Sequence, residues 1–426
     1  MSKKNFFIKN LNNINKSINN LLEKNLNKLK FKNLINLISN NKIILTFAVI
    51  SVLFISYLLV PTFFKVSQIS NQLKQEIFEK YNLNLNFRNS LRYNLFPRPH
   101  FTSNDTIIFY NNDEISKIKK IKIFVSLDNL FTLKNIQVND LLIQKANFNL
   151  NKDNYNFFTN LLNNSFIEKN LTIKNSNIFF RNEENEVLFI NQISDLNYFY
   201  ESNELLNKLV SENEIFNIPY SIELSKSDFE KKFFFKLNVN FLNLQIKNEL
   251  YNENKIKSGN AKIIYNKLKS NISYNLHKNL IEFDFYDKLD NPEFSFNGKF
   301  NLNPFYAILK GKSEKLNLAN FFNPESLFVK ILKTKIFNSK NIDFEFNLNS
   351  NTINNYPSFE KINLNLKIKE GLIDIDNTSF EWKKISEFKI YDSLIFIKDG
   401  ELILDSKLEI NIDNYNEIYK FLLTPK

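Results

Sequence analysis

The sequence predicts a mainly β protein that follows a single N-terminal transmembrane helix. Two observations lead to this prediction. Residues 43–64 form an apolar run without a charged side chain. After residue 82, apolar and polar residues alternate in one segment after another, which is the pattern of strands with one apolar and one polar face. With 43% hydrophobic residues in 426, the chain can bury a large core, which excludes a wholly disordered protein.

The net charge of +11 is concentrated at the N-terminus. Residues 1–42 contain nine lysines and one acidic residue, whereas residues 65–426 contain 47 basic and 44 acidic residues. The large part of the chain therefore lacks the basic excess that a nucleic-acid partner requires. Apolar residues from Phe7 to Leu29 recur every three to four positions, which predicts an amphipathic helix. We expect this segment to lie on an anionic inner leaflet, with a partner helix or a loosely folded tail as the alternatives.

Residues 43–64, with the sequence IILTFAVISVLFISYLLVPTFF, predict a membrane-spanning helix, since about 20 apolar residues cross the hydrocarbon core. A cleaved signal peptide would have a shorter apolar core before a small-residue cleavage site. Here 42 residues precede the run, which ends in Phe63 and Phe64. The lysine excess before the run predicts a cytoplasmic N-terminus. No second apolar run of this length follows, so we expect a single-pass protein.

Residues 66–80 predict a short amphipathic helix, because Val66, Ile69, Leu73 and Ile77 share one side. Alternation then predicts about 20 strands. Further helices are expected only at residues 203–210, 324–337 and 414–423. Asparagine is abundant, together with lysine, isoleucine and phenylalanine, all of which have A/T-rich codons. We therefore discount asparagine as a turn signal in this chain.

Strands with one apolar face create a covering problem, because three or four short helices cannot bury the apolar faces of about 20 strands. Two architectures solve it. A second sheet can pack on the first, as in tandem β-sandwiches or barrels. Alternatively, one long curved sheet can form a groove that another apolar molecule fills, and next to a bilayer that molecule is a lipid. The alternation alone favours sandwiches.

The composition removes most catalytic and metal-binding chemistry. The chain has no cysteine, its two histidines, His100 and His277, are far apart, and its five glycines form no phosphate-binding loop. Glu282, Asp284 and Asp287 stand close together, as paired acid–base carboxylates would. However, Glu282 and Asp284 alternate with apolar residues, which predicts a solvated strand face. We therefore expect no enzyme activity, no cofactor and no metal site.

Residues 83–99, with the sequence LNLNFRNSLRYNLFPRP, resemble the opening of AsmA-like proteins, in which a membrane anchor and a short helix precede a strand and a Leu-Phe-Pro motif. The matching residues are Leu91, Leu95, Phe96, Pro97 and Pro99. Tyr93 stands in place of the usual tryptophan and His100 in place of the usual glycine. Residues 117–150 also resemble the family, with Ser126, Leu127, Leu130 and Leu133 in its turn between strands. Residues 298–322 are similar to a family repeat that ends at Gly311.

This resemblance implies an inner-membrane protein of a Gram-negative bacterium with its bulk in the periplasm. It implies an elongated, curved, groove-forming antiparallel β-sheet with a few short helices, and it moves our expectation from sandwiches to that groove. The implied role is phospholipid transport to the outer membrane and homeostasis of that membrane. Membrane lipids are the expected partners, a periplasmic or outer-membrane protein is a candidate partner at the far end, and no nucleic acid is expected.

On this basis we divide the chain into four parts. These are a basic amphipathic cytoplasmic segment (1–42), a transmembrane helix (43–64), an AsmA-like N-terminal module (65–160) and a continuation of the β-groove (161–426). We expect the apolar sides of the alternating strands to line the groove. The candidate lining residues are Phe233, Phe235, Leu237, Val239, Phe241, Ile281, Phe283, Phe285, Phe294, Phe296, Ile342, Phe344, Phe346, Leu348, Ile362, Leu364, Leu366 and Ile368.

A second function from another class stays open at this point. An anchored scaffold or assembly factor for outer-membrane biogenesis would close its sheets into dry sandwiches and conduct no lipid. The two functions differ in whether protein or lipid fills the apolar face. A periplasmic enzyme is a weaker third possibility, because no nucleophile–base pair or metal cluster stands out.

Overall fold

The structure, a computed structural model, describes residues 42–423 with internal gaps. The residues left out within that range are 112, 129, 131–135, 152, 155, 158–169, 183, 228–231, 252–256, 267, 278–279, 287–293, 303–304, 319–322, 324, 335 and 400. The amphipathic segment predicted for residues 1–42 lies outside the described residues, apart from Lys42, with which the first helix begins.

The described elements follow one another in the order helix, helix, then strands with a few short helices between them. The helical elements are α3 (Lys42–Leu59), η1 (Val60–Phe63), α4 (Val66–Tyr81), η3 (Asn240–Leu242), α7 (Leu327–Leu332), η4 (Ile336–Asn338) and α8 (Tyr415–Leu423). The strands of the first half are β1 (Asn84–Phe87), β2 (Arg92–Asn94), β3 (His100–Tyr110), β4 (Asp113–Val125), β5 (Val138–Leu150), β6 (Asn170–Arg181), β7 (Val187–Glu201), β8 (Leu206–Ile215), β9 (Ile218–Ser227), β10 (Lys232–Val239) and β11 (Leu244–Tyr251). Those of the second half are β12 (Lys257–Tyr265), β13 (Leu268–His277), β14 (Leu280–Tyr286), β15 (Phe294–Leu302), β16 (Phe305–Leu316), β17 (Asp343–Ile353), β18 (Tyr356–Lys369), β19 (Leu372–Asp374), β20 (Ser379–Trp382), β21 (Ser386–Lys398) and β22 (Glu401–Ile412).

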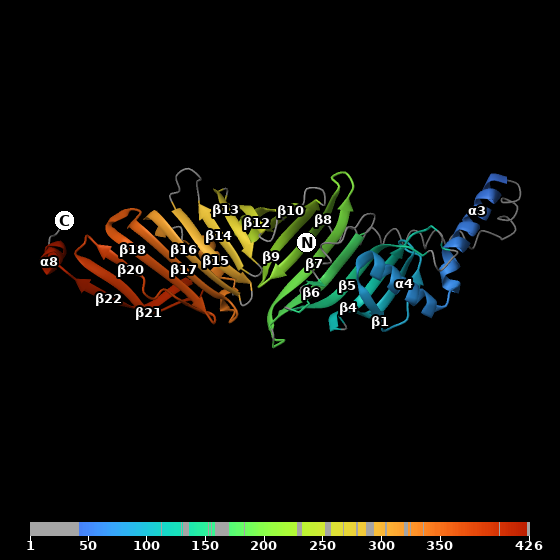
Figure 1. Cartoon of the computed structure of the whole chain (residues 1–426), viewed down its shortest axis with the longest axis horizontal. Coiled ribbons are helices and arrows are strands. Elements are labelled where there is room, and N and C mark those ends of the chain that lie inside the picture. Colours follow the sequence, from blue (N-terminus) through green and yellow to red (C-terminus); the bar gives the residue numbers. More distant parts are fainter. Residues whose placement is uncertain are drawn as a thin grey trace, which may run out of the picture.

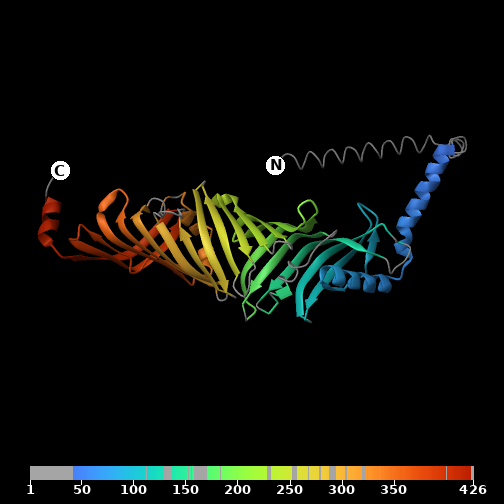
Figure 2. The same cartoon turned by 45° about the horizontal axis from the view of Figure 1, so that its top comes forward.

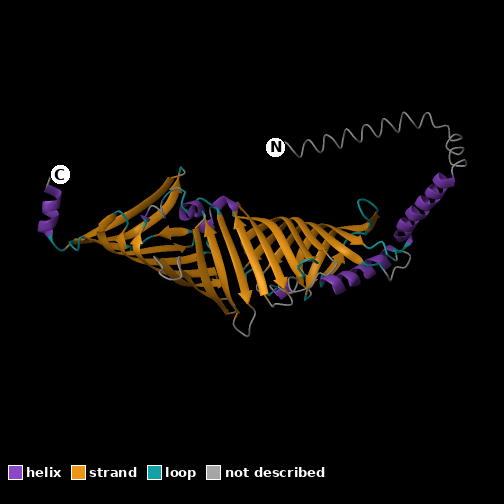
Figure 3. Cartoon of the chain, turned by 90° about the horizontal axis from the view of Figure 1, so that it is seen from above, coloured by secondary structure: helices purple, strands orange, loops and turns teal. Residues whose placement is uncertain are grey.

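Within the described residues, 22 strands form one curved sheet (Figure 1). The strands lie side by side along the long axis of the molecule, with α3 beyond one end and α8 beyond the other (Figures 1 and 3). Consecutive strands are neighbours from β3 to β18, and β20, β21 and β22 continue the sheet. Both β1 and β2 pair with β3, and β19 pairs with β18. The prediction of one elongated, curved sheet is confirmed.

The expectation of tandem sandwiches, which the alternation alone favours, is wrong. All the described strands hydrogen-bond into the same sheet, so no second sheet packs on the first. Alternation tells which side chains share a face, but it does not tell what covers that face. The sheet is also not antiparallel throughout, because β5–β6 and β16–β17 pair in parallel. Parallel neighbours need a crossover connection, and α7 and η4 lie in the second of these crossovers.

The helices follow the prediction in part. The predicted helix 66–80 is α4, which ends at Asn82 in the left-handed conformation (φ 54°). The predicted helix 414–423 is α8, and the predicted helix 324–337 shrinks to the short α7 and η4. The prediction of a helix at 203–210 is wrong. There the chain makes a turn and enters β8, because pairing with β7 and β9 outweighs the helix-like spacing of Leu205, Leu206 and Leu209.

Asparagine marks turns after all. Of the 19 described residues other than glycine that have positive φ, nine are asparagines, among them Asn243 and Asn355 in hairpin turns. Asparagine tolerates the left-handed conformation better than most residues. Asparagine is therefore a turn signal in this chain, and the expectation that it carries no such information is wrong.

One helix among the described residues is long and apolar enough to cross a membrane, over Leu45–Phe63. Its side chains are largely exposed, with Ile43 at 80% and Phe47 at 73%. It leaves the sheet at an angle to α4 and makes few contacts with the rest of the protein (Figure 2).

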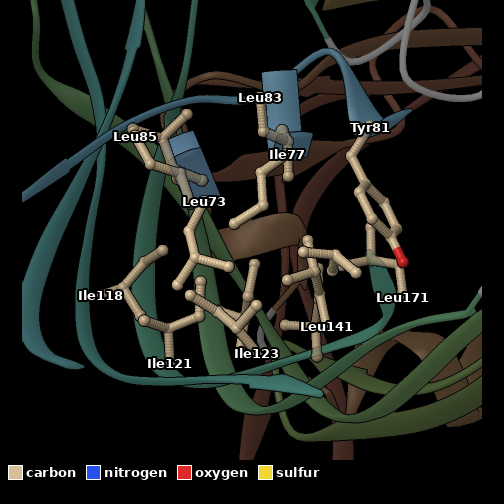
Figure 4. Packing of buried hydrophobic residues seen from close by; sticks show 14 of the residues in the cluster. Leu73, Ile77, Tyr81, Leu83, Leu85, Ile118, Ile121, Ile123, Leu141 and Leu171 are labelled. Carbon is tan, nitrogen blue, oxygen red and sulfur yellow. The ribbon is translucent and has the colours of Figure 1, made fainter. Parts of the chain in front are cut away.

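The most deeply buried core lies where α4 packs on the sheet (Figure 4). Leu73 and Ile77 of α4 are fully buried, and Ile118 and Ile121 of β4 and Leu141 of β5 face them across this core. The N-terminal module therefore has a dry core made from one helix and one face of the sheet.

We predict that Leu73→Ala lowers the free energy of unfolding by about 2–5 kcal/mol, because the removed side chain leaves a cavity in this core. The matched control is Phe78→Ala on the same helix, where the ring is 54% exposed. That change should cost no more than about 0.5 kcal/mol. Pulse proteolysis of the detergent-solubilised full chain in a urea series measures both values. Equal destabilisation by the two variants would contradict the packing described here.

Candidate functional site

Strand register carries the apolar side chains onto one continuous face of the sheet. Leu85 pairs with Ile108, Phe101 with Ile123, and the series of directly opposed residues continues without a break to β18. A second series, two residues farther along the strands, runs Leu250–Gly259–Tyr274–Phe283–Gly298–Leu309–Phe346–Leu366 in the middle of the sheet. Since directly opposed residues point to the same side, all of these belong to one surface, which we call the apolar face.

The N-terminal part of the apolar face is covered by α4. Tyr81 at the end of α4 is fully buried, and its hydroxyl donates to the Asn139 carbonyl at 2.8 Å. Burial, with the nearby charges of Asp140 and Glu76, raises the pKa of Tyr81. The side chains of β3, β4 and β5 beneath this helix are almost all buried, so this part holds no accessible apolar surface.

The middle of the apolar face is uncovered. Among the described residues from Leu244 to Asn301, Gly259 is the only buried one, although this stretch carries many large apolar side chains. Ile272, Phe283, Phe285 and Phe296 are examples, and each is half-buried. In a closed sandwich such residues would be sealed against a second sheet. Here they lie open on one side.

Few polar groups interrupt this middle part. On the described positions of the apolar face between Leu244 and Leu309, the polar side chains other than tyrosine are Asn248, Lys257 and Ser270. Apart from Lys257, the described charged side chains of this stretch lie on the opposite face, where Lys299 of β15 pairs with Glu282 of β14 at 2.7 Å. This ion pair lowers the pKa of Glu282. The solvated strand face predicted for Glu282 and Asp284 thus agrees with the register, and the described residues contain no cluster of His, Asp and Glu suited to a metal ion.

The short helix α7 shows that the apolar face is concave. Leu327 and Ile331 on one side of α7 pack against a cluster of β9, β10 and η3. Phe328 and Leu332 on its other side pack against a cluster of β18, β19 and β21. A six-residue helix is about 9 Å long.

In a flat sheet, eight strand spacings of about 4.8 Å would separate β10 from β18 by roughly 38 Å. One short helix touches both, so the sheet curls until these strands approach each other. We call the resulting concavity, walled by the apolar face of β10–β18, the trough. The helix α7 bridges the two clusters, and its first turn is capped by the bond from the Val329 N–H to the Ser326 hydroxyl at 3.2 Å.

The predicted lining residues divide into three groups. Half-buried on the apolar face are Phe233, Phe235, Leu237, Ile281, Phe283, Phe285, Phe296, Phe344 and Leu366, with Ile342 just before β17. Buried among protein side chains are Val239, Phe346, Leu348, Ile362, Leu364 and Ile368. Phe241 lies in η3 rather than in β10 and is 55% exposed. Phe294 belongs to β15, and its side chain lies outside the described part.

A buried polar network, which sequence reasoning missed, separates the covered part of the apolar face from the trough. Tyr220 of β9 donates to Asn191 Oδ1 of β7 at 2.6 Å, and Ser211 of β8 donates to Asn213 Oδ1 at 2.9 Å. Burial raises the pKa of Tyr220 to about 12. The available signal was the polar run Ser211-Glu212-Asn213, where apolar residues are expected on every second position.

The segments that carry the family resemblance hold the end of α3. The Tyr93 hydroxyl donates to the Leu58 carbonyl at 2.8 Å. The Tyr57 hydroxyl donates to the Leu127 carbonyl and accepts from the Leu130 N–H at 3.1 Å. Leu133 of the same turn lies outside the described residues. Both motifs therefore dock the apolar helix on the sheet.

The motif residues themselves differ in burial. Leu91 is buried, Leu95 and Pro99 are half-buried, Phe96 is 86% exposed, and Pro97 is exposed. Arg98, between the two prolines, pairs with Asp140 at 2.7 Å. His100 is buried at the start of β3, where desolvation lowers its pKa and Nδ1 lies 2.7 Å from the Arg98 carbonyl.

We predict that Tyr220→Phe lowers the free energy of unfolding by about 1–3 kcal/mol, since the buried Asn191 oxygen loses its donor. Tyr356→Phe, at a side chain 62% exposed, is the control. The raised pKa of Tyr220 favours the neutral phenol in the folded state. The wild type should therefore lose stability as the pH rises from 10 to about 12, by more than Tyr220→Phe does. Denaturant series at pH 8 and pH 11 measure this difference, and identical pH dependence would contradict it.

Two comparisons with known proteins bear on the family. A search of curated proteins found no match to the chain. The family model described as AsmA family matches residues 40–188, a span that contains α3, α4 and β1 to β6. These elements include the docked helix α3 and the part of the sheet that α4 covers. The resemblance predicted from the sequence is confirmed over residues 40–188, where the chain is similar to the AsmA family.

Proposed function

We propose that this protein is a lipid-transfer protein anchored in the inner membrane, whose trough carries phospholipid acyl chains through the periplasm toward the outer membrane. The observation that supports this most directly is the uncovered apolar face of β11–β15, where large apolar side chains are half-buried on one continuous surface. Exposed apolar surface of this extent requires an apolar partner. We propose binding and transfer without catalysis.

Energetics favour such a surface over free diffusion of lipid. An acyl chain of about 16 carbons costs on the order of 10 kcal/mol in water, at ~0.8 kcal/mol per CH₂. Each CH₂ that rests on the trough recovers part of this cost. Six strands, β10 to β15, extend over about 24–29 Å, which exceeds the half-thickness of a bilayer core of about 15 Å. The trough is therefore wide enough for an extended acyl chain.

The AsmA-like segment and α3 support the membrane attachment. The exposed apolar surface of α3 suits a bilayer, and the lysines of residues 1–42 favour a cytoplasmic N-terminus. In this arrangement α4 and the covered core stand next to the membrane, and the trough begins farther along the sheet (Figure 2).

The scaffold function remains the alternative, but its structural basis has changed. It was expected to have closed sandwiches with a dry interior, and the sheet is single. A scaffold would now have to fill the trough with a protein partner instead of lipid.

We predict that a periplasm-dependent reporter fused after Lys426 is active and a cytoplasm-dependent one is not. The lysines of residues 1–42 favour a cytoplasmic Met1, and one span among the described residues would then put Lys426 on the other side. Alkaline phosphatase and a cytoplasm-dependent fluorescent protein, fused at the same position, are the matched pair. A cytoplasmic C-terminus would overturn the proposed anchoring.

We predict that Phe283→Asp leaves the protein folded but lowers its bound phospholipid severalfold. The new carboxylate can hydrate in an open trough, whereas acyl chains cannot rest on it. The control is Asn271→Asp on the neighbouring strand β13, which adds the same charge on the opposite face, opposite Lys262. Lipid is measured by mass spectrometry after gentle solubilisation, with protease resistance as the folding test. If Phe283→Asp unfolds the protein, the position belongs to a dry core, and if it stays folded with unchanged lipid, the trough does not carry lipid.

A further inference from the structure

Three of the five glycines lie on the apolar face of β12–β16, and each is covered by an aromatic ring from the directly opposed residue. Gly259 pairs with Tyr274, Gly298 with Phe283, and Gly311 with Phe296. A Cβ atom at Gly259 would stand 2.4 Å from the Tyr274 hydroxyl oxygen. At Gly298 it would stand 2.7 Å from Phe283 Cζ, and at Gly311 it would stand 2.2 Å from Phe296 Cε1.

These distances mean that the rings lie against the sheet. An ordinary carbon–carbon contact is about 3.5–4.0 Å, so each ring occupies the space that any side chain at the paired position would need. Phe296 of β15 reaches across Gly311 of β16 as far as Phe346 of β17, with the two ring centres 5.5 Å apart. On its other side Phe285 of β14 lies 5.8 Å away.

The glycines are not required by backbone conformation. Gly371 is the only described glycine with positive φ, so Gly259, Gly298 and Gly311 have backbone angles that other residues adopt. A glycine within a strand loses side-chain packing and backbone entropy, and such glycines mark places where another group approaches closely. The group that approaches each of these three is an aromatic ring, which shields the bare backbone.

We infer that the glycine–aromatic pairs set the depth of the trough. Acyl chains then lie over rings that rest flat on the sheet, and not against rings that project from it. This inference rests on the proposed function. A methyl group at Gly311 would displace the Phe296 ring by more than about 1 Å. The sheet blocks the ring from below, and Phe285 and Phe346 flank it. The ring therefore rises into the space that the acyl chain needs.

The test uses the full chain, solubilised and mixed with vesicles of phosphatidylethanolamine and phosphatidylglycerol that contain a phospholipid with a photoreactive group in its acyl chain. Cross-linked peptides of β12–β17 are counted separately from those of α3, which binds surrounding lipid in any case. Melting temperature is recorded for every variant. Gly298 is avoided, because a Cβ there would also stand 2.4 Å from the Ile308 carbonyl oxygen, which cannot move aside.

We expect Gly311→Ala to lower the cross-link yield in β12–β17 at least twofold and to leave the yield in α3 unchanged. Phe296→Ala, which removes the ring and keeps the glycine, should maintain or raise the yield. The double variant Gly311→Ala/Phe296→Ala should return to the wild-type yield. Gly259→Ala with Tyr274→Ala provides a second, independent pair, at which the three atoms nearest to the added methyl group all belong to the Tyr274 side chain.

The outcomes separate this inference from the proposed function. If the wild type gives no cross-links in β12–β17, the proposed function fails and the inference fails with it. If the wild type cross-links and folded Gly311→Ala gives the same yield, the inference alone is wrong. It is also wrong if the single and double variants lose lipid in proportion to their loss of melting temperature, because the glycines then serve only stability.

Discussion

The structure depends on keeping one face of the sheet apolar across sixteen neighbouring strands, from β3 to β18. A slip of one residue would move a strand's apolar set to the other side, so each register has to be held. The strands β3–β7 show how strict this requirement is. Side by side across the sheet, each of these five strands has a residue that is not paired in the ladder, and three of these residues, Asp105, Lys145 and Asn175, have positive φ. Because neighbouring strands skip residues together, their register is the same before and after the skip, and the apolar face stays continuous.

A continuous apolar face must be covered, and the chain covers it unevenly. Next to α3, the helix α4 seals the face with fully buried side chains such as Leu73 and Ile77. Farther along, Leu332 of α7 belongs to the buried cluster of Ile368, and side chains of β16, β17 and β18 bury Leu348. Between them the strands have no such cover. The largest buried core therefore lies at the end where α3 is docked, and the part proposed to bind lipid keeps its apolar surface available.

Alternation in the sequence was enough to place Ile281, Phe283 and Phe285 on one face, and helical spacing was enough to find α4. Neither signal states which strands are neighbours or how strongly the sheet bends. The parallel pairs β5–β6 and β16–β17 and the reach of α7 between two distant clusters therefore appear only in the structure. A regular alternation also does not show where a strand ends. The alternating run from Phe233 continues to Phe241, but the strand ends at Val239 and Asn243 turns the chain at φ 51°. The buried network around Asn191 was hidden because polar residues on an apolar face look like a break in the strand.

Glycine and asparagine have different roles in this chain. Glycine usually supplies the left-handed conformation in turns, but in this chain asparagine holds nine of the 19 described positions of that kind among the other residues. Among the described glycines, only Gly371 adopts the left-handed conformation. Where it persists inside strands, at Gly259, Gly298 and Gly311, the reason must be its lack of a side chain, and the space is taken by an aromatic ring in each case. All three sites lie on the apolar face, Gly259 and Gly298 in its uncovered part and Gly311 on β16, where it is buried next to Leu348. Because each ring lies against the backbone of a neighbouring glycine and not above another side chain, the surface of the apolar face stays low at these three places.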